Sequence, residues 1–135
     1  MRQQLLDARL DSGHWEGQLS ASALSTATAI STFSFYLAEP SSDPAIFPLI
    51  TPQIRRGLHW LKQQQNDDGG WGDTGRSHSN IATSMLVVSA FHLTGVPAEH
   101  SDLLQRAHRY IESAGGIAAL RRRYGKDKTF AAPIL

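Results

Sequence analysis

Asp67 and Asp68 are the adjacent carboxylates whose type and spacing come closest to acid chemistry in this sequence. An acid that protonates a weakly basic substrate must be buried, because burial keeps the carboxyl group protonated. Gly69 and Gly70 follow directly, and such residues are typical of an exposed turn. We therefore predict that both carboxylates, and Asp73 close by, serve the turn and not catalysis.

The other reactive side chains form no recognised catalytic or metal-binding pattern. A zinc site is not expected, because no two histidines stand in a His-x-x-x-His pair with an acidic partner among His14, His59, His78, His92, His100 and His108. The absence of cysteine excludes disulfides and thiolate metal sites. The hydroxyl-rich stretch 20–34 has no Gly-x-Ser-x-Gly nucleophile motif, and its small side chains favour close helix packing. We predict no catalytic, metal-binding or cofactor-binding residue.

The charge balance argues against a nucleic-acid partner. The chain carries 13 basic and 12 acidic residues, for a net charge of +1, so no general attraction to polyanions follows. We interpret the local excess at residues 121–123, with Lys126 and Lys128, as a solvated helix end; a patch facing phosphate or lipid is the less favoured alternative. No signal peptide or apolar run of about 20 residues is visible. We expect a cytoplasmic protein, peripheral at most to the inner membrane.

Helices joined by Gly-rich turns must position these residues. Proline, glycine and capping residues predict helices over residues 3–10, 20–37, 51–65, 80–94, 101–115 and 117–124. The expected N-caps are Ser20, Thr51 (followed by Pro52) and Ser101. No segment alternates apolar and polar residues with β-branched enrichment, so the fold class is all-α.

The expected helices are of two kinds. Residues 51–65 and 101–114 carry a narrow apolar stripe, as in a helix with one face in water. Residues 81–93 are apolar nearly all round, and residues 22–37 are short-chained and mostly uncharged, as in helices covered on both sides. Inner and outer helices therefore alternate, as expected when helical hairpins stack around a centre. We expect an apolar face to stay exposed along the inner helices in this chain alone and to drive self-association, because two outer helices cannot cover all of Ile81, Met85, Leu86, Val88 and Phe91.

An internal repeat supports the stacking of hairpins. A helix end followed by Gly-x-Trp occurs twice, at Gly13 to Trp15 and at Gly69 to Trp71, 56 residues apart. A weaker third copy aligns residues 107–111 with residues 57–61 and ends in Gly115-Gly116. Repetition of a supersecondary unit is typical of architectures in which each unit buries its apolar face against the next.

Residues 56–61 and 65–71 resemble the QW motif of triterpene cyclases, in which a basic, a small and an aromatic residue precede Q-x-x-x-G-x-W. A Gln amide at a helix end can bond free N–H groups of the next helix and stack on the Trp indole, while glycine supplies the turn conformation. The motif residues are Arg56, Gly57, Trp60, Gln65, Gly69 and Trp71, and a degenerate first copy includes Gly13 and Trp15.

The resemblance covers nearly the whole chain and points to squalene-hopene-cyclase-like proteins, with some departures. Lys62 and Gln63 replace apolar residues of the motif, Arg9 stands where the first copy would have Gln, and the third copy lacks both Gln and Trp. The resemblance implies an isomerase, a terpene cyclase of triterpenoid biosynthesis. Such an enzyme folds a polyprenyl chain in an apolar cavity between two α-barrels.

The implied reaction needs an aspartic acid from a D-x-D-D motif to protonate a terminal alkene, and aromatic faces then stabilise the carbocation. No metal or cofactor is implied. The D-x-D-D motif belongs to the other barrel and does not occur in these 135 residues. We therefore predict that this chain alone does not catalyse cyclisation.

We expect residues 1–135 to be the N-terminal portion of one squalene-cyclase-like domain. Its fold would be helical hairpin repeats of an α/α toroid, a partial (α/α)6 barrel, with residues 133–135 leading into another inner helix. Two alternatives stay open: the N-terminal domain of a class II diterpene cyclase, and a non-catalytic toroid module that binds an apolar ligand or a partner chain. A protein prenyltransferase β-subunit is disfavoured, since its zinc needs a cysteine. The expected partners are a polyprenyl substrate such as squalene, and the missing barrel half or a second copy.

Overall fold

The computed structural model describes residues 2–15 and 20–124, and this part of the chain is all-α, as predicted. It has no named strand among these residues, and one isolated bridge pairs Ser22 with Thr74. The α-helices are α1 (Arg2–Asp7), α2 (Ala23–Ala38), α3 (Phe47–Gln63), α4 (Ile81–Leu93), α5 (Ser101–Ser113) and α6 (Gly116–Tyr124). Two 3-10 turns, η1 (Pro44–Ile46) and η2 (Pro97–His100), precede α3 and α5.

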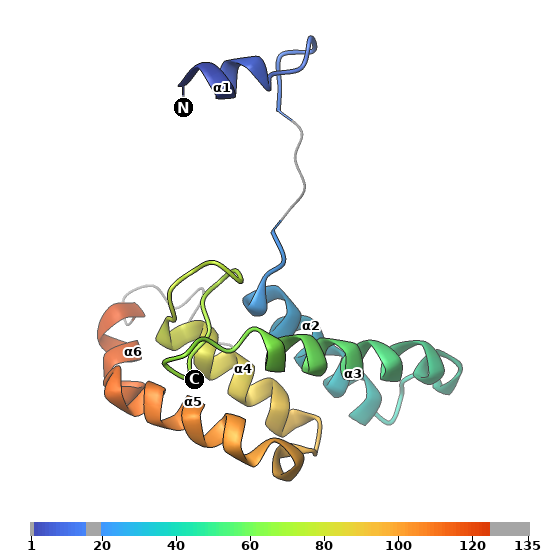
Figure 1. Ribbon diagram of the computed structural model, residues 1–135. Helices are drawn as coiled ribbons and strands as arrows, with labels where there is room; N and C mark the ends of the chain where they lie inside the picture. The colour runs from blue at the N-terminus through green and yellow to red at the C-terminus, as the bar shows by residue number, and fades with distance from the viewer. Residues whose placement is uncertain (1, 16–19, 125–135) are drawn as a thin grey trace.

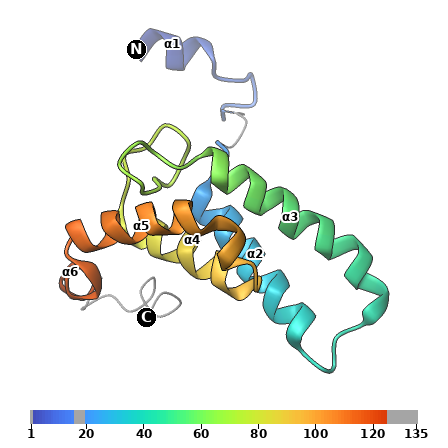
Figure 2. The same ribbon diagram turned by 60° about the horizontal axis from the view of Figure 1, so that its bottom comes forward.

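The helices pack as two hairpins in an inner and an outer layer (Figure 1). Helices α2 and α4 lie side by side, α3 packs on α2, and α5 packs on α4 (Figure 2). Helix α6 contacts both α4 and α5 and closes that end of the body. This arrangement confirms the expected order of inner and outer helices, and it is that of a fragment of an α/α toroid.

Helix α4 lies at the centre of the core, since its own side chains are apolar on nearly every side. Eight of its 13 residues are buried, among them Phe91 and Val87 with no exposed surface. Asn80 caps its N-terminus by accepting a hydrogen bond from the Thr83 N–H. The expectation that Ile81, Leu86, Val88 and Phe91 cannot all be covered is therefore wrong, because α2, α5 and α6 pack against α4 and bury all four. Met85 is partly buried, and Leu93 at the C-terminal end is 41% exposed.

Exposed apolar side chains do occur on α2, the other inner helix. Its buried residues are Ala23, Ala27 and Ile30, whereas Phe35 is 62% exposed and Leu24 is 39% exposed. Four hydroxyl groups of α2 donate to the carbonyl four residues earlier, which satisfies them within the helix. The hydroxyl groups of this stretch thus take part in local hydrogen bonding within the helix.

Close packing of α3 on α2 depends on Gly57. A Cβ at this position would lie 2.8 Å from the Ile30 Cδ1 atom, closer than carbon atoms approach in packed cores. The buried residues of α3 follow the predicted stripe and are Ile50, Ile54, Leu58 and Leu61. The glycine of the motif therefore sets the distance between an inner helix and its outer partner.

The predicted helix starts were wrong in three places. Helix α3 begins at Phe47 and not after Thr51, whose hydroxyl donates to the Phe47 carbonyl inside the helix. Pro52 is accommodated early in the helix, where its missing N–H removes a single intrahelical bond. The N-cap of α2 is Ser22 and not Ser20. Helix α5 follows η2 without a break, so Ser101 is its first residue and its side chain caps nothing.

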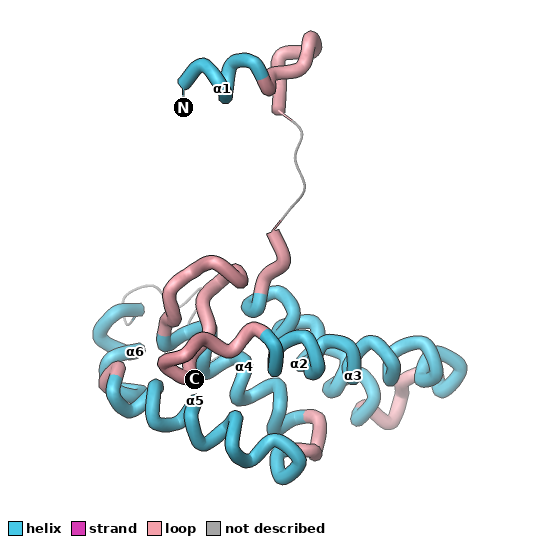
Figure 3. The backbone as a smooth tube through the Cα atoms, viewed as in Figure 1, coloured by secondary structure: helices cyan, strands magenta, loops and turns pink. Residues whose placement is uncertain are grey.

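Helix α1 and the turn after it stand apart from the helical body in the drawn structure (Figures 1 and 3). None of the residues of α1 is buried. No helix among the described residues is long and apolar enough to span a membrane. The inner helix expected after residues 133–135 lies outside the described residues.

Candidate functional site

Trp71 ties the end of α3 to the start of α4. The indole has no exposed surface, and its Nε1–H donates to the Leu61 carbonyl at 2.8 Å. The backbone N–H of Trp71 donates to the Ser84 hydroxyl at 2.9 Å, and the Trp71 carbonyl accepts from the Asn80 N–H at 2.9 Å. Because each polar group of Trp71 is paired, the whole residue can be buried without an unmet hydrogen bond.

Gln65 links the same turn to the next outer helix, α5. Its Nε2 donates to the Gly69 carbonyl at 2.9 Å and to the Leu103 carbonyl at 3.0 Å. The sequence led us to expect bonds to the free N–H groups of the next helix, but the partner on α5 is a carbonyl. The Gln65 Oε1 atom is buried and has no hydrogen-bond partner among the described residues. The expected stacking of this amide on the indole stays a prediction.

Glycine is required where the turn touches α5. Gly69 has a φ of +88°, a conformation that side chains rarely adopt. A Cβ on Gly69 would lie 2.6 Å from the Arg106 carbonyl oxygen, and a Cβ on Gly70 would lie 2.7 Å from the Tyr110 ring. The backbone of the turn therefore rests directly on α5, which no residue with a side chain would permit.

The carboxylates near this turn have structural roles, in line with our prediction. Asp68 accepts hydrogen bonds from the Gly70 N–H at 2.9 Å and from the Ser79 hydroxyl at 2.7 Å. Asp73 accepts from the Asn80 side chain at 2.8 Å and from the Thr83 hydroxyl. Asp67, Asp68 and Asp73 are all exposed, unlike an acid held in its protonated form by burial.

Tyr110 packs against this turn from α5. Burial of its phenol raises the pKa above its ordinary value, and the negative charge of Asp68 raises it further, while Arg123 acts in the opposite direction. The neutral phenol is therefore favoured in the folded chain. Tyr110 packs against Gly70 of this turn, and its signals in the sequence were the amphipathic pattern of α5 and its alignment with Trp60 in the third repeat copy.

The two Gly-x-Trp turns share their hydrogen bonds, position by position. We call residues 9–15 the first turn and residues 65–71 the second turn. In the first, Trp15 Nε1–H donates to the Leu5 carbonyl at 2.5 Å, ten residues back, as Trp71 does to Leu61. Gly13 has the same φ of +88° as Gly69.

Arg9 takes over the role of Gln65 in the first turn. Its Nε donates to the Gly13 carbonyl at 2.8 Å, as the Gln65 amide donates to Gly69. Its guanidinium carbon also lies 5.5 Å from the centroid of the Trp15 ring, within the range of a cation–π contact. The departure noted in the sequence is thus a substitution that keeps the hydrogen bond.

Burial separates the two turns. Trp15 is 51% exposed and Trp71 is fully buried. The second turn is covered by α4 and α5, through Ser84 and the Leu103 carbonyl. The local hydrogen bonds form in both environments, and the contacts to neighbouring helices distinguish them.

Comparison with known proteins gives a consistent result. Residues 1–123 match the sequence model of the squalene-hopene cyclase N-terminal domain. The chain belongs to this family. It is 32% identical over 108 residues to a squalene hopane cyclase from Aspergillus fumigatus; the aligned region covers 80% of this chain and 13% of that relative. The chain thus spans a small part of the length of the curated relative it matches. No solved structure matches it.

The remaining motif residues of this family member lie on α3. Arg56 is exposed, and Trp60 is partly buried against the core. Gly57 lies where α3 packs on α2, and the basic residue stays in water. Within the described ranges, no group of three or more His, Asp or Glu side chains could hold a metal ion. The arrangement can position helices, and it brings together no set of groups for acid, base or nucleophilic catalysis.

Ser84 and Asn66 are structural residues that the sequence analysis missed. Ser84 is fully buried and bonds Trp71, and the Asn66 amide donates to the Ser77 carbonyl and the Ser79 hydroxyl. The sequence contains one signal for Ser84: it is a polar residue on a helix that is otherwise apolar nearly all round. A buried hydroxyl on such a helix needs a partner, and a Gly-rich turn before the helix could supply one.

Proposed function

We propose that this chain is the N-terminal part of a triterpene cyclase of the squalene-hopene type, and that it contributes inner helices to a barrel that folds a polyprenyl chain. The second turn carries this proposal, because Gln65, Gly69 and Trp71 hold three successive helices together in a chain of the squalene-hopene cyclase N-terminal family. The proposed substrate is squalene or a related polyprene. The curated relative is described as a squalene hopane cyclase.

The chain's own residues would position the cavity wall and leave the chemistry to other segments. In this proposal an aspartic acid of a D-x-D-D motif, which does not occur in this sequence, protonates the terminal alkene. The second turn fixes α4 between α3 and α5, and a rigid wall would keep the reacting chain folded. The chain alone would therefore produce no cyclised product.

Incubation with squalene tests the catalytic part of this proposal. The 135-residue chain should yield no hopene-type product above a protein-free control, while a complete cyclase of the family yields product under the same conditions. Any product from the chain alone would contradict the proposal. Geranylgeranyl diphosphate is the second substrate to include. If the graft described next converts it, that result would favour the diterpene cyclase alternative.

A graft tests the positive claim. Residues 1–123 would replace the matching segment of the Aspergillus fumigatus relative, with and without Trp71→Ala. We expect squalene cyclisation by the graft, and loss of activity in the Trp71→Ala graft because the inner helices are no longer fixed. A folded graft without activity, beside an active parent, would indicate a non-catalytic toroid module.

We also propose that the exposed face of α2 meets the rest of the barrel or, in its absence, a second copy of this chain. Leu24 and Phe35 lie exposed on an inner helix, and apolar surface of this kind is usually covered. Sedimentation at several concentrations, with a fluorescent apolar dye, tests the idea. A monomer at every concentration without dye binding would contradict it.

A further inference from the structure

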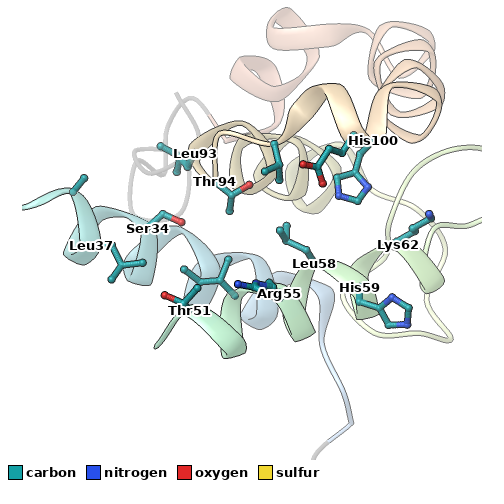
Figure 4. A pocket seen from close by; sticks show the side chains of 14 residues that line it. Ser34, Leu37, Thr51, Arg55, Leu58, His59, Lys62, Leu93, Thr94 and His100 are labelled. Atoms are coloured by element: carbon teal, nitrogen blue, oxygen red, sulfur yellow. The ribbon is translucent and has the colours of Figure 1, made fainter. Parts of the chain in front are cut away.

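A groove of about 780 Å³ lies between α3 and the end of α4, away from both turns (Figure 4). The last turn of α2 supplies part of its wall, and η2 supplies the side opposite α3. Its volume is within the range of about 300–1,000 Å³ that is typical of small-molecule sites. Neither the motif residues nor the proposed cyclisation uses this groove.

The groove lies between the α2–α3 hairpin and the end of the α4–α5 hairpin. Gln65 fixes the C-terminal end of α3 to α5. Helix α3 packs on α2, with Gly57 against Ile30, and α5 packs on α4. The α3 residues that line the groove recur at helical spacing, so one continuous strip of the helix faces it: Thr51, Ile54, Arg55, Leu58, His59 and Lys62.

The groove combines an apolar lining with unpaired cations. Its apolar residues come from α2, α3, the end of α4 and the residue before η2, and they include Leu37, Ile54, Leu58, Leu93 and Val96. Arg55 and Lys62 are exposed and make no hydrogen bond or ion pair with any residue that the structure describes. Glu99 is the carboxylate that lines the groove. Positive charge therefore exceeds negative charge along an apolar surface.

Polarity also changes along the groove. Figure 4 shows Lys62 and His100 toward one end, and Leu37 and Leu93 toward the other. Leu93 is 41% exposed, so its apolar surface is available to an occupant. A ligand that matches this gradient has an anionic group at one end and a hydrocarbon chain behind it, since charge-assisted bonds to Lys or Arg are the strong ones.

We propose that this groove binds a single-chain anionic amphiphile, with a carboxylate or phosphate headgroup at the Lys62 end and its hydrocarbon tail running past Leu58 toward Leu93 and Leu37; Arg55, between the two ends, adds positive charge that favours an anion. The site is distinct from the exposed face of α2, on which the proposed barrel contact depends. It is therefore independent of the proposed cyclase function. A neutral polyprene would gain nothing from the two cations.

Binding of four dodecyl compounds below their micelle concentrations tests this proposal. The probes are dodecanoate, dodecyl phosphate, dodecanol and dodecyltrimethylammonium, titrated into the 135-residue chain and followed by calorimetry and amide NMR shifts. At least one of the two anions should bind saturably, at least about tenfold more tightly than the alcohol or the cation. The tighter anion identifies the headgroup. Shifts should concentrate at residues 51–62 and 93–100.

Charge variants locate the headgroup. Arg55→Gln with Lys62→Gln should weaken binding of the anion at least about tenfold, and Glu99→Gln should tighten it, because a like charge beside the headgroup is removed. Arg109→Gln, at an exposed cation of α5 outside the groove, is the matched control and should change nothing. All four positions are exposed, so the fold should survive, which circular dichroism verifies.

Four results would overturn the proposal. They are the absence of saturable binding, equal binding of dodecanol and the anions, an unchanged affinity in the Arg55→Gln, Lys62→Gln variant, and equal weakening by Arg109→Gln. Shifts confined to the exposed face of α2 would also reject this site, because they would assign the binding to the barrel contact.

Discussion

Replacement of Trp71 by alanine should be among the most damaging single changes in this chain. The indole has no exposed surface, and removal of a fully buried Trp side chain costs about 3–5 kcal/mol in free energy of unfolding. The lost donor also leaves the Leu61 carbonyl without its partner. A buried polar group left unpaired costs about 1–3 kcal/mol, so the upper part of the range is expected.

Trp15→Ala is the matched control, because Trp15 donates the same bond ten residues back in the first turn. Its ring is 51% exposed, so its loss should cost less than about 1 kcal/mol. The Trp71→Phe variant separates the contribution of the buried ring to the free energy of unfolding from that of the hydrogen bond. It keeps an apolar ring and loses the donor, so it should cost about 1–3 kcal/mol.

Urea unfolding followed by far-ultraviolet circular dichroism measures these differences, since it does not depend on Trp fluorescence. The free energies of unfolding should rank Trp15→Ala above Trp71→Phe and Trp71→Ala last. A loss below about 1 kcal/mol for Trp71→Ala would mean that the ring is not part of the core. Equal losses for the two alanine variants would refute the claim that burial, and not the shared hydrogen bond, distinguishes the turns.

Three further predictions concern the contact between the second turn and α5. Gly69→Ala should cost about 1–3 kcal/mol more in unfolding free energy than Gly95→Ala, because both glycines have positive φ but only at Gly69 would the Cβ meet a backbone carbonyl; equal losses in urea unfolding would contradict this. Gln65→Leu should cost about 1–3 kcal/mol by leaving the Leu103 and Gly69 carbonyls unpaired, and a neutral result in the same assay would show that water or another donor replaces the amide. Tyr110→Phe should reduce the loss of stability above about pH 10. The raised pKa means that the folded chain holds the phenol proton more tightly than the unfolded chain does, so Tyr110 contributes stability below its unfolded pKa that is lost as the pH rises through the folded pKa. A pH series of unfolding curves in which both proteins change alike would reject this assignment.

Helix type and layer could be predicted from the sequence, whereas helix starts and exposed faces could not. Apolar residues lie on nearly every side of α4, which predicts a helix that other elements cover. In any orientation, a side turned to water would expose apolar residues. The start of α3 was misplaced at Thr51 because proline at N1 is a strong local signal. Residues 47–50 extend the helix upstream, since Pro48 occupies the first turn there and Ile50 is buried.

The exposed apolar face shows the limit of reasoning helix by helix. The composition of α4 predicts that two outer helices cannot cover it, but α2 packs along it and α6 adds a third cover. Helices α3 and α4 cover two sides of α2, and exposed apolar surface remains on another side, at Leu24 and Phe35. Which of two neighbouring inner helices keeps an open face depends on the order of hairpins in space, and no local pattern encodes that order.

The two turns separate what a short segment determines from what the fold adds. Arg9 and Gln65 differ in chemistry, yet each donates to the carbonyl of a glycine four residues later, and both glycines have the same φ. The local hydrogen bonds therefore need a donor of suitable length and a glycine, and they do not need Gln. Gln65 differs in that its amide also donates to the Leu103 carbonyl on α5. The motif's glutamine is thus explained by the contact between helices, whereas the turn itself accepts either residue.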